Sequence, residues 1–222
     1  MARVWLITGP SSGFWHEFVK QILARGDKVI ATACSLSKIQ HLKEIGTATL
    51  DVIAAEAISL FGRRDVLIKM PGIRNFGYLR LCSTQDEYFR AQDSGTVVTI
   101  GSMSACETYP GIGANSASKA ANRYDMDGMD EKVTFTRIRT LLNSVSGEIS
   151  ILEYQSLRGD PEKGVACIID VVRGENGGRW QQVAEGIALG PDTLLGIRRR
   201  CEETLKLLTE WEEFSKSTDI VE

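Results

Sequence analysis

Three polar side chains in the middle of the chain are spaced so that they can share one site. Ser102 follows the apolar run 96–100 after a single glycine, and Asn115 and Lys119 come later. A spacing of four residues places Asn115 and Lys119 on one face of a helix. A hydroxyl, an amide and an ammonium group form a polar pocket that can hold a substrate oxygen. The Asn115 amide donates and accepts hydrogen bonds, but it does not titrate near neutral pH.

A strand and a helix must position these side chains. Residues 96–100 are β-branched and apolar, which is typical of a strand buried on both faces of a parallel sheet. Residues 115–121 are small and compatible with a helix packed tightly against a flat surface. The loop between them contains Pro110, Gly111 and Gly113. The stretch therefore predicts a strand, a loop and a helix, with Ser102 just beyond the strand.

A second chemical pattern lies near the N-terminus, where the apolar run 2–8 leads into a glycine-rich turn before a predicted helix at 14–24. The turn carries two glycines and two serines that can line a phosphate: Gly9, Ser11, Ser12 and Gly13. A strand, a glycine-rich turn and a helix together present backbone N–H groups to a phosphate, as in dinucleotide-binding folds. The alternative is a plain turn that binds nothing.

Strand and helix patterns alternate along the rest of the chain. Further strands are expected at 28–33, 48–52, 65–70, 134–142 and 181–189, and further helices at 37–44, 84–92, 161–172 and 191–216. This order predicts an α/β fold with a doubly wound, mostly parallel, Rossmann-like sheet in a single domain, residues 1–222. The crossover at 53–64 is near the minimum length. The segment 71–95 offers one short helix, so it should leave apolar sheet surface exposed or covered by another chain.

Composition narrows the class of protein. The chain has 222 residues, 43% of them hydrophobic, and a net charge of -3, which gives no basic field to attract nucleic acid. Five cysteines lack metal-ligand spacing, so we expect free thiols and no metal site. No stretch has the length of a membrane span or the pattern of a signal peptide. We expect a soluble, cytoplasmic protein without a membrane partner.

With these elements the chain resembles the short-chain dehydrogenase/reductases (SDRs), over almost its whole length. Their pattern is a strand ending in a catalytic serine, then a helix with Tyr-x-x-x-Lys. Ser102 and Lys119 match this pattern, and Asn115 stands where the family has the tyrosine that passes a proton to or from the substrate oxygen. The resemblance implies catalytic positions at Ser102, Asn115 and Lys119, a nicotinamide cofactor and a small-molecule substrate.

The resemblance also implies a cofactor site. The family's Thr-Gly-x-x-x-Gly-x-Gly motif is matched by Thr8, Gly9 and Gly13, and Trp15 occupies the last glycine position. An indole there is expected to push the first helix outward or to swing over the phosphate site. The residue after the second strand determines the preference for NAD or NADP. An acid there binds the ribose hydroxyl of NAD, and a cation binds the 2′-phosphate of NADP. That residue is Cys34, followed by Ser35 and then Lys38. Because no acid is present and hydroxyls and a lysine are near, NADP is favoured over NAD.

Other cofactor positions follow from the resemblance. Asp51 matches the acid beside the adenine, although it is equally a cap for a following helix. Gly72 remains from the family's Asn-Asn-Ala-Gly turn, and Lys119 is expected to hold the cofactor ribose. Lys69 replaces the first asparagine of that turn. A lysine at the end of a central strand is either a buried charge or a sign that the site is open to water, and the open site is less costly.

Three functions agree with these observations. The first is an NADP(H)-dependent oxidoreductase acting on a carbonyl or secondary alcohol, impaired by Asn115, with a water or Tyr109 replacing the missing acid. The second is an inactive SDR pseudoenzyme that serves as a nucleotide-sensing or protein-interaction module. The third is a non-redox catalyst using the polar pocket of Ser102, Asn115 and Lys119.

The last predicted helix, 191–216, carries an apolar stripe. Its members are Leu194, Leu195, Ile197, Cys201, Leu205, Leu208, Trp211 and Phe214. Such a stripe is expected to pack in the core or in a homodimer rather than to line a ligand site.

Overall fold

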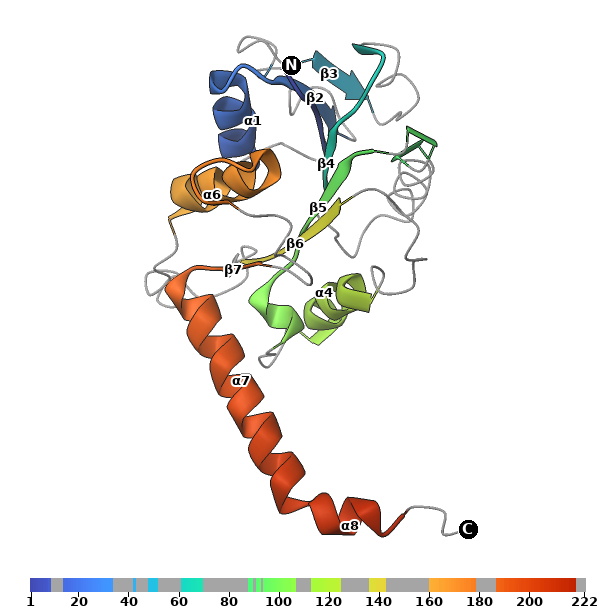
Figure 1. Ribbon diagram of the computed structural model, residues 1–222, viewed down its shortest axis with the longest axis vertical. Coiled ribbons are helices and arrows are strands. Elements are labelled where there is room, and N and C mark those ends of the chain that lie inside the picture. Colours follow the sequence, from blue (N-terminus) through green and yellow to red (C-terminus); the bar gives the residue numbers. More distant parts are fainter. Residues whose placement is uncertain are drawn as a thin grey trace.

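Seven parallel strands form one sheet in the computed structural model, with helices on both faces (Figure 1). The strands are β1 (Val4–Thr8), β2 (Lys28–Ala33), β3 (Ala48–Asp51), β4 (Val66–Lys69), β5 (Thr96–Ile100), β6 (Thr136–Leu142) and β7 (Ile187–Leu189). Their order across the sheet is β3-β2-β1-β4-β5-β6-β7, and every neighbouring pair is parallel. This is the doubly wound arrangement that the sequence predicts.

The structure describes residues 1–8, 14–33, 42, 48–51, 61–69, 88–89, 91–92, 94–106, 113–124, 136–142, 160–178 and 187–218. The helices among them are α1 (Phe14–Ala24), η3 (Met103–Ala105, a 3-10 turn), α4 (Gly113–Tyr124), α6 (Pro161–Arg173), α7 (Pro191–Glu210) and α8 (Glu212–Lys216). Most of the helix predicted at 37–44 and the first six residues of the strand predicted at 181–189 lie outside this description.

Side chains of β1 alternate between two cores, because successive strand residues point to opposite faces of the sheet. Trp5 and Ile7 join an apolar cluster with α1 and α6, which contact each other on one side of the sheet. Val4 and Leu6 join a second cluster, which includes Phe89, on the other side. Burial on both faces explains why the strands are continuous apolar runs.

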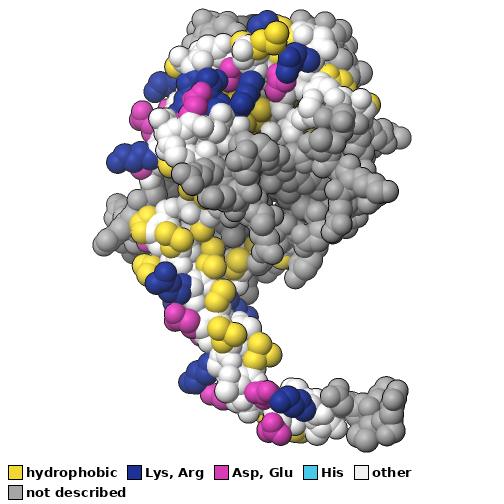
Figure 2. Space-filling model, viewed as in Figure 1, with side chains coloured by type: hydrophobic (Ala, Val, Ile, Leu, Met, Phe, Trp, Pro, Cys, Tyr) yellow, Lys and Arg dark blue, Asp and Glu magenta, His cyan; other side chains and the backbone are white. Residues whose placement is uncertain are grey.

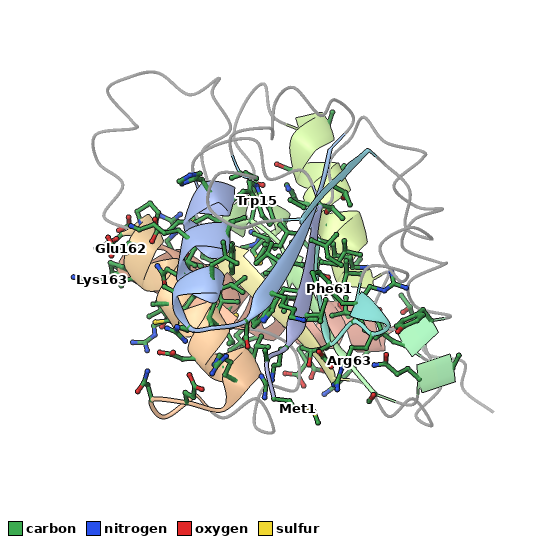
Figure 3. The ribbon with its side chains drawn as sticks, turned by 90° about the horizontal axis from the view of Figure 1, so that it is seen from above. Met1, Trp15, Phe61, Arg63, Glu162 and Lys163 are labelled. Atoms are coloured by element: carbon green, nitrogen blue, oxygen red, sulfur yellow. The ribbon has the colours of Figure 1, made fainter. Side chains whose placement is uncertain are left out.

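Local sequence signals fix the ends of α6. The Asp160 carboxylate accepts hydrogen bonds from the backbone N–H groups of Glu162 (2.9 Å) and Lys163 (3.3 Å), and Pro161 occupies the first turn. Gly174 ends the helix with a φ of 69°, a left-handed conformation that glycine adopts without strain. The helix predicted at 161–172 is confirmed, and it extends one residue further. Glu162 and Lys163 lie on the outer side of the molecule in Figure 3.

Two expectations concern apolar surface. Val4, Leu6 and Leu67 are buried, so exposed sheet surface is not found at these positions of β1 and β4. Most of the stripe predicted at 191–216 is exposed, and its helix is interrupted at Trp211 between α7 and α8. The stripe does not pack in the core of this chain, which leaves the homodimer as the other predicted role.

A buried carboxylate ties the start of the sheet to the end of α6. One oxygen of Asp27 accepts the backbone N–H of Arg3 at 2.9 Å. The other accepts the indole N–H of Trp5 at 2.9 Å and the guanidinium of Arg173 at 2.6 Å. The hydrogen bond to Asp27 raises the pKa of Arg173 above its ordinary value, so Arg173 stays charged. Three parts of the chain that are distant in sequence thus meet at one side chain.

We therefore expect Asp27→Ala to lower the free energy of unfolding by about 3 kcal/mol, because it leaves a buried indole N–H and a guanidinium without their acceptor. Urea unfolding followed by circular dichroism measures this loss. The matched control is Lys163→Ala, which removes an exposed ion pair with Asp160 and should cost about 0.5 kcal/mol or less. Equal losses in the two variants would contradict a central role for Asp27.

Candidate functional site

The parallel sheet brings the carboxyl ends of its strands to one edge. At this edge β1 ends at Thr8, β4 ends at Lys69, and β5 leads through Gly101 to Ser102. Ligands of open parallel sheets bind outside the carboxyl ends of the strands. This edge is therefore the candidate site.

Ser102 is held by its own turn. The side chain is buried, and its Oγ accepts hydrogen bonds from the backbone N–H of Ser104 at 3.2 Å and from the Ser104 hydroxyl at 3.0 Å. These bonds make Ser102 the N-cap of η3. A hydroxyl has two acceptor positions and one proton, so Ser102 keeps its own proton for donation to another group.

Helix α4 brings Lys119 close to this turn, because α4 packs against η3. Ser116 and Lys119 are both buried on α4, with exposed fractions of 7% and 8%. The backbone of Asn115 lies one helical turn before Lys119, as the sequence predicts. The Asn115 side chain is outside the described part of the structure. The strand, turn and helix predicted around Ser102 are confirmed.

Burial changes the chemistry of Lys119. Removing an ammonium group from water disfavours its charged form, and this lowers the pKa of Lys119 below the ordinary value of 10.5. The side chain consequently releases its proton more readily than an exposed lysine does. A buried cation at the edge where ligands bind is well placed to meet a ligand oxygen.

Sequence reasoning misjudged Lys69 and missed Thr99. Lys69 is only 6% exposed, so the expectation of a lysine open to water is wrong. It pairs in register with Thr99 of β5, and both side chains lie on the sheet face opposite Ile68 and Val98. Among the described residues, the buried Thr99 hydroxyl has no hydrogen-bond partner. In the sequence, the only indication of a polar role for Thr99 was the presence of a threonine within an apolar run.

Trp15 turns into the core. Its indole is 8% exposed and stacks on Phe18 with ring centres 5.9 Å apart, while Phe14 meets it edge-on at 6.3 Å. Trp15 belongs to the cluster between the sheet and helices α1 and α6 (Figure 3). Of the two expectations for Trp15, the indole swinging over the phosphate site is therefore wrong, because the indole packs in this cluster.

This arrangement fits a dinucleotide phosphate. Helix α1 begins at Phe14, soon after the end of β1 at the carboxyl edge, so the N–H groups of its first turn face that edge. Asp51 ends β3, two strands from β1, but its side chain is not described. The other predicted cofactor positions lie outside the described residues: Gly9, Ser11, Ser12, Gly13, Cys34 and Gly72.

Other classes of site are not seen in the ranges described. No group of three or more His, Cys, Asp or Glu side chains there is arranged to hold a metal ion. None of the helices in these ranges combines the length and apolar character needed to cross a membrane.

Comparison with known proteins adds to this geometry. No family model matches the chain. Two uncharacterized oxidoreductases, from Staphylococcus saprophyticus and Staphylococcus haemolyticus, are each 25% identical to it, over 64% and 62% of this chain and 72% and 74% of theirs. A short-chain dehydrogenase from Streptomyces avermitilis superposes with a TM-score of 0.81 over 98% of both chains, at 24% identity. The chain is thus similar to two oxidoreductases in sequence and shares the fold of a short-chain dehydrogenase.

These similarities support the general prediction of an SDR-like oxidoreductase. The position of α1 at the carboxyl edge agrees with the way in which doubly wound folds hold a dinucleotide. Ser102 and Lys119 are the described residues of the SDR catalytic pattern in this chain, and Asn115 is its departure.

The lowered pKa of Lys119 makes stability depend on pH. Between the lowered pKa and 10.5 the unfolded chain binds more protons than the folded one, so the free energy of unfolding rises with pH across that interval. Lys119→Met removes this group. We expect the stability of the variant relative to the unmodified protein to be greatest at neutral pH and to decrease toward pH 10.5.

Urea unfolding of both proteins at several pH values between 7 and about 10.5 measures this difference, and titrations shared by both proteins cancel. A difference that stays constant across this range would contradict a lowered pKa for Lys119.

Proposed function

We propose that the chain is an NADP(H)-dependent SDR oxidoreductase that interconverts a carbonyl and a secondary alcohol of a small molecule. The observation that carries this proposal is the unit of β5, η3 and α4, which buries Ser102 and Lys119 at the carboxyl edge of the sheet. The protein acts in the cytoplasm under this proposal, without a nucleic-acid or membrane partner.

Ser102 binds and orients the substrate oxygen. Because Ser104 donates two hydrogen bonds to its Oγ, the Ser102 hydroxyl keeps its own proton for donation to a carbonyl oxygen. Negative charge that develops on this oxygen during reduction is stabilised by such a donor. Ser104 is thus a positioning residue for Ser102.

Lys119 holds the cofactor ribose in this proposal and adds positive charge near the reacting oxygen. The nicotinamide ring supplies hydride to the carbonyl carbon when the cofactor is bound. The carbonyl oxygen must then receive a proton, which Asn115 cannot supply because its amide does not titrate. A water or Tyr109, which lies outside the described residues, supplies that proton. The lowered pKa of Lys119 favours proton release toward such a relay.

The preference for NADP rests on the end of β2. This strand ends at Ala33, so Cys34 is the residue that follows it. With no acid at that position to bind the ribose 2′-hydroxyl of NAD, and with Ser35 and Lys38 following, a 2′-phosphate is favoured.

Asn115 also favours a second candidate function. Loss of the general acid removes one required part of the reaction, and a chain that binds the cofactor without turnover serves as a nucleotide-sensing or protein-interaction module. A non-redox catalyst that uses the same polar pocket is the remaining alternative. Restoring the missing phenol separates these functions.

We expect Asn115→Tyr to raise the turnover number for carbonyl reduction by about a hundredfold or more, because it returns a titratable hydroxyl one helical turn from Lys119. Loss of NADPH absorbance over a panel of small aldehydes and ketones measures this rate. The matched control is Asn115→Phe, which adds the same ring without the hydroxyl and should leave the rate unchanged.

The possible results assign the function. A gain with tyrosine but not with phenylalanine supports an impaired oxidoreductase. Cofactor binding without any gain from tyrosine would contradict the redox proposal and favour the nucleotide-sensing module. Conversion of a bound metabolite at constant NADPH absorbance would favour the non-redox catalyst.

A further inference from the structure

Helices α7 and α8 form an arm that extends away from the sheet (Figure 1). Helix α7 has 20 residues and is therefore about 30 Å long. Seven large apolar side chains on the arm are each more than half exposed: Leu194, Leu195, Leu205, Leu207, Leu208, Trp211 and Phe214. Figure 2 shows hydrophobic side chains along the arm. Exposed apolar surface of this extent marks an interaction site.

The arm is anchored at its start. Thr193 is fully buried, and α7 contacts β7 and η3, the turn that follows Ser102. Pro191 occupies the first turn of the helix. From residue 198 to residue 218 every side chain is exposed. The contacts with β7 and η3 therefore fix the position of the start of the arm, and most of its length is exposed.

Five residues of α7 repeat at the spacing of a helix-pairing seam. Leu194, Ile197, Cys201, Leu205 and Leu208 are separated by three, four, four and three residues. This spacing keeps them on one side of the helix, as in coiled coils. An isolated helix of this length is marginally stable in water, because helices in proteins are held mainly by packing of an apolar face. We therefore expect α7 to be stabilised by another element that packs on the seam.

The arm is also divided by charge. Residues 191–200 contain three arginines and one aspartate, whereas residues 201–218 contain five glutamates and two lysines. Several of these charges form exposed ion pairs within the arm, such as Arg200 with Glu203 at 3.8 Å and Lys206 with Glu210 at 3.8 Å. Exposed ion pairs of this kind contribute little to stability. The same charged side chains can therefore pair with another chain at little cost.

We propose that the arm pairs antiparallel with the arm of a second copy of this chain. A two-fold axis across α7 places the seam of one copy on the seam of the other, which is how a self-complementary surface forms a closed dimer. In this orientation the arginines of one copy face the glutamates of its partner. A parallel pair would place like charges together, which is unfavourable.

Three of the seven exposed side chains lie on the seam: Leu194, Leu205 and Leu208. With Ile197 and Cys201 they form the apolar contact between the two copies. The proposal is independent of the proposed function, because none of the seam residues belongs to the Ser102 and Lys119 site.

Analytical ultracentrifugation of the full chain tests the pairing. We expect the unmodified protein to be a dimer at micromolar concentration, and Leu205→Glu with Leu208→Glu to weaken dimerisation by about a hundredfold or more. The matched control is Lys206→Glu, at a position between them that is 78% exposed and off the seam, and it should leave the dimer intact. A monomeric unmodified protein, or a dimer that survives the double substitution, would overturn the proposal.

Charge reversal tests the orientation without changing any apolar residue. Reversal of Arg198, Arg199 and Arg200 to Glu should dissociate the dimer. When the two seams lie on one another, Leu194 is opposite Leu208 and Arg199 and Arg200 are opposite Glu203 and Glu202 of the second copy. Further reversal of Glu202 and Glu203 to Arg in the same chain should therefore restore the dimer, because the facing charges are again complementary. Parallel pairing predicts no such loss and recovery, so an unchanged dimer in both variants would overturn the antiparallel arrangement. Near-ultraviolet circular dichroism checks that the body of each variant stays folded.

Discussion

Parallel strand pairing around β5 is the constraint on which the rest of the structure depends. Because β4, β5 and β6 run in the same direction and in fixed register, their carboxyl ends meet at one edge of the sheet. Ser102 reaches that edge because it follows β5 directly, and α4 reaches it by packing on the turn that Ser102 caps. A shift of β5 by one residue would turn its buried side chains to the wrong faces and displace the site with them.

The burial of Lys119 is the feature on which the proposed function depends. An ammonium group loses hydration when it is buried, and an apolar residue at the same position would avoid that penalty. The helix nevertheless places the cation beside the Ser102 turn. Under the proposed function, a ligand oxygen that approaches Lys119 offsets part of this penalty.

The sequence predicted the elements that are governed by local or continuous signals. β5 is apolar along its whole length because both its faces are buried, and α6 has an aspartate cap, a proline start and a glycine stop. Side-chain direction was less predictable, because it depends on contacts between distant segments. The Trp15 side chain packs in a cluster formed by α1, α6 and the sheet. The residues next to Trp15 in the sequence do not determine this orientation.

The same limit applies to the candidate site and to the arm. The positions of Ser102, Asn115 and Lys119 could be predicted because a strand, a turn and a helix follow one another within a short stretch. Burial of Lys69 depends on the neighbouring strand and could not be predicted. The sequence pattern of an apolar helical stripe is the same whether the stripe packs in a core or against another chain. The exposure of α7 could therefore be recognised only in the structure.

The central claim is that this edge of the sheet binds a nicotinamide dinucleotide. Isothermal titration calorimetry of the unmodified protein with NADPH, and separately with NADH, tests it most directly, and it requires neither a substrate nor a fluorescent residue in the site. The account predicts saturable binding of one cofactor per chain, with NADPH bound more tightly than NADH. Absence of heat with either cofactor at millimolar concentration would contradict it.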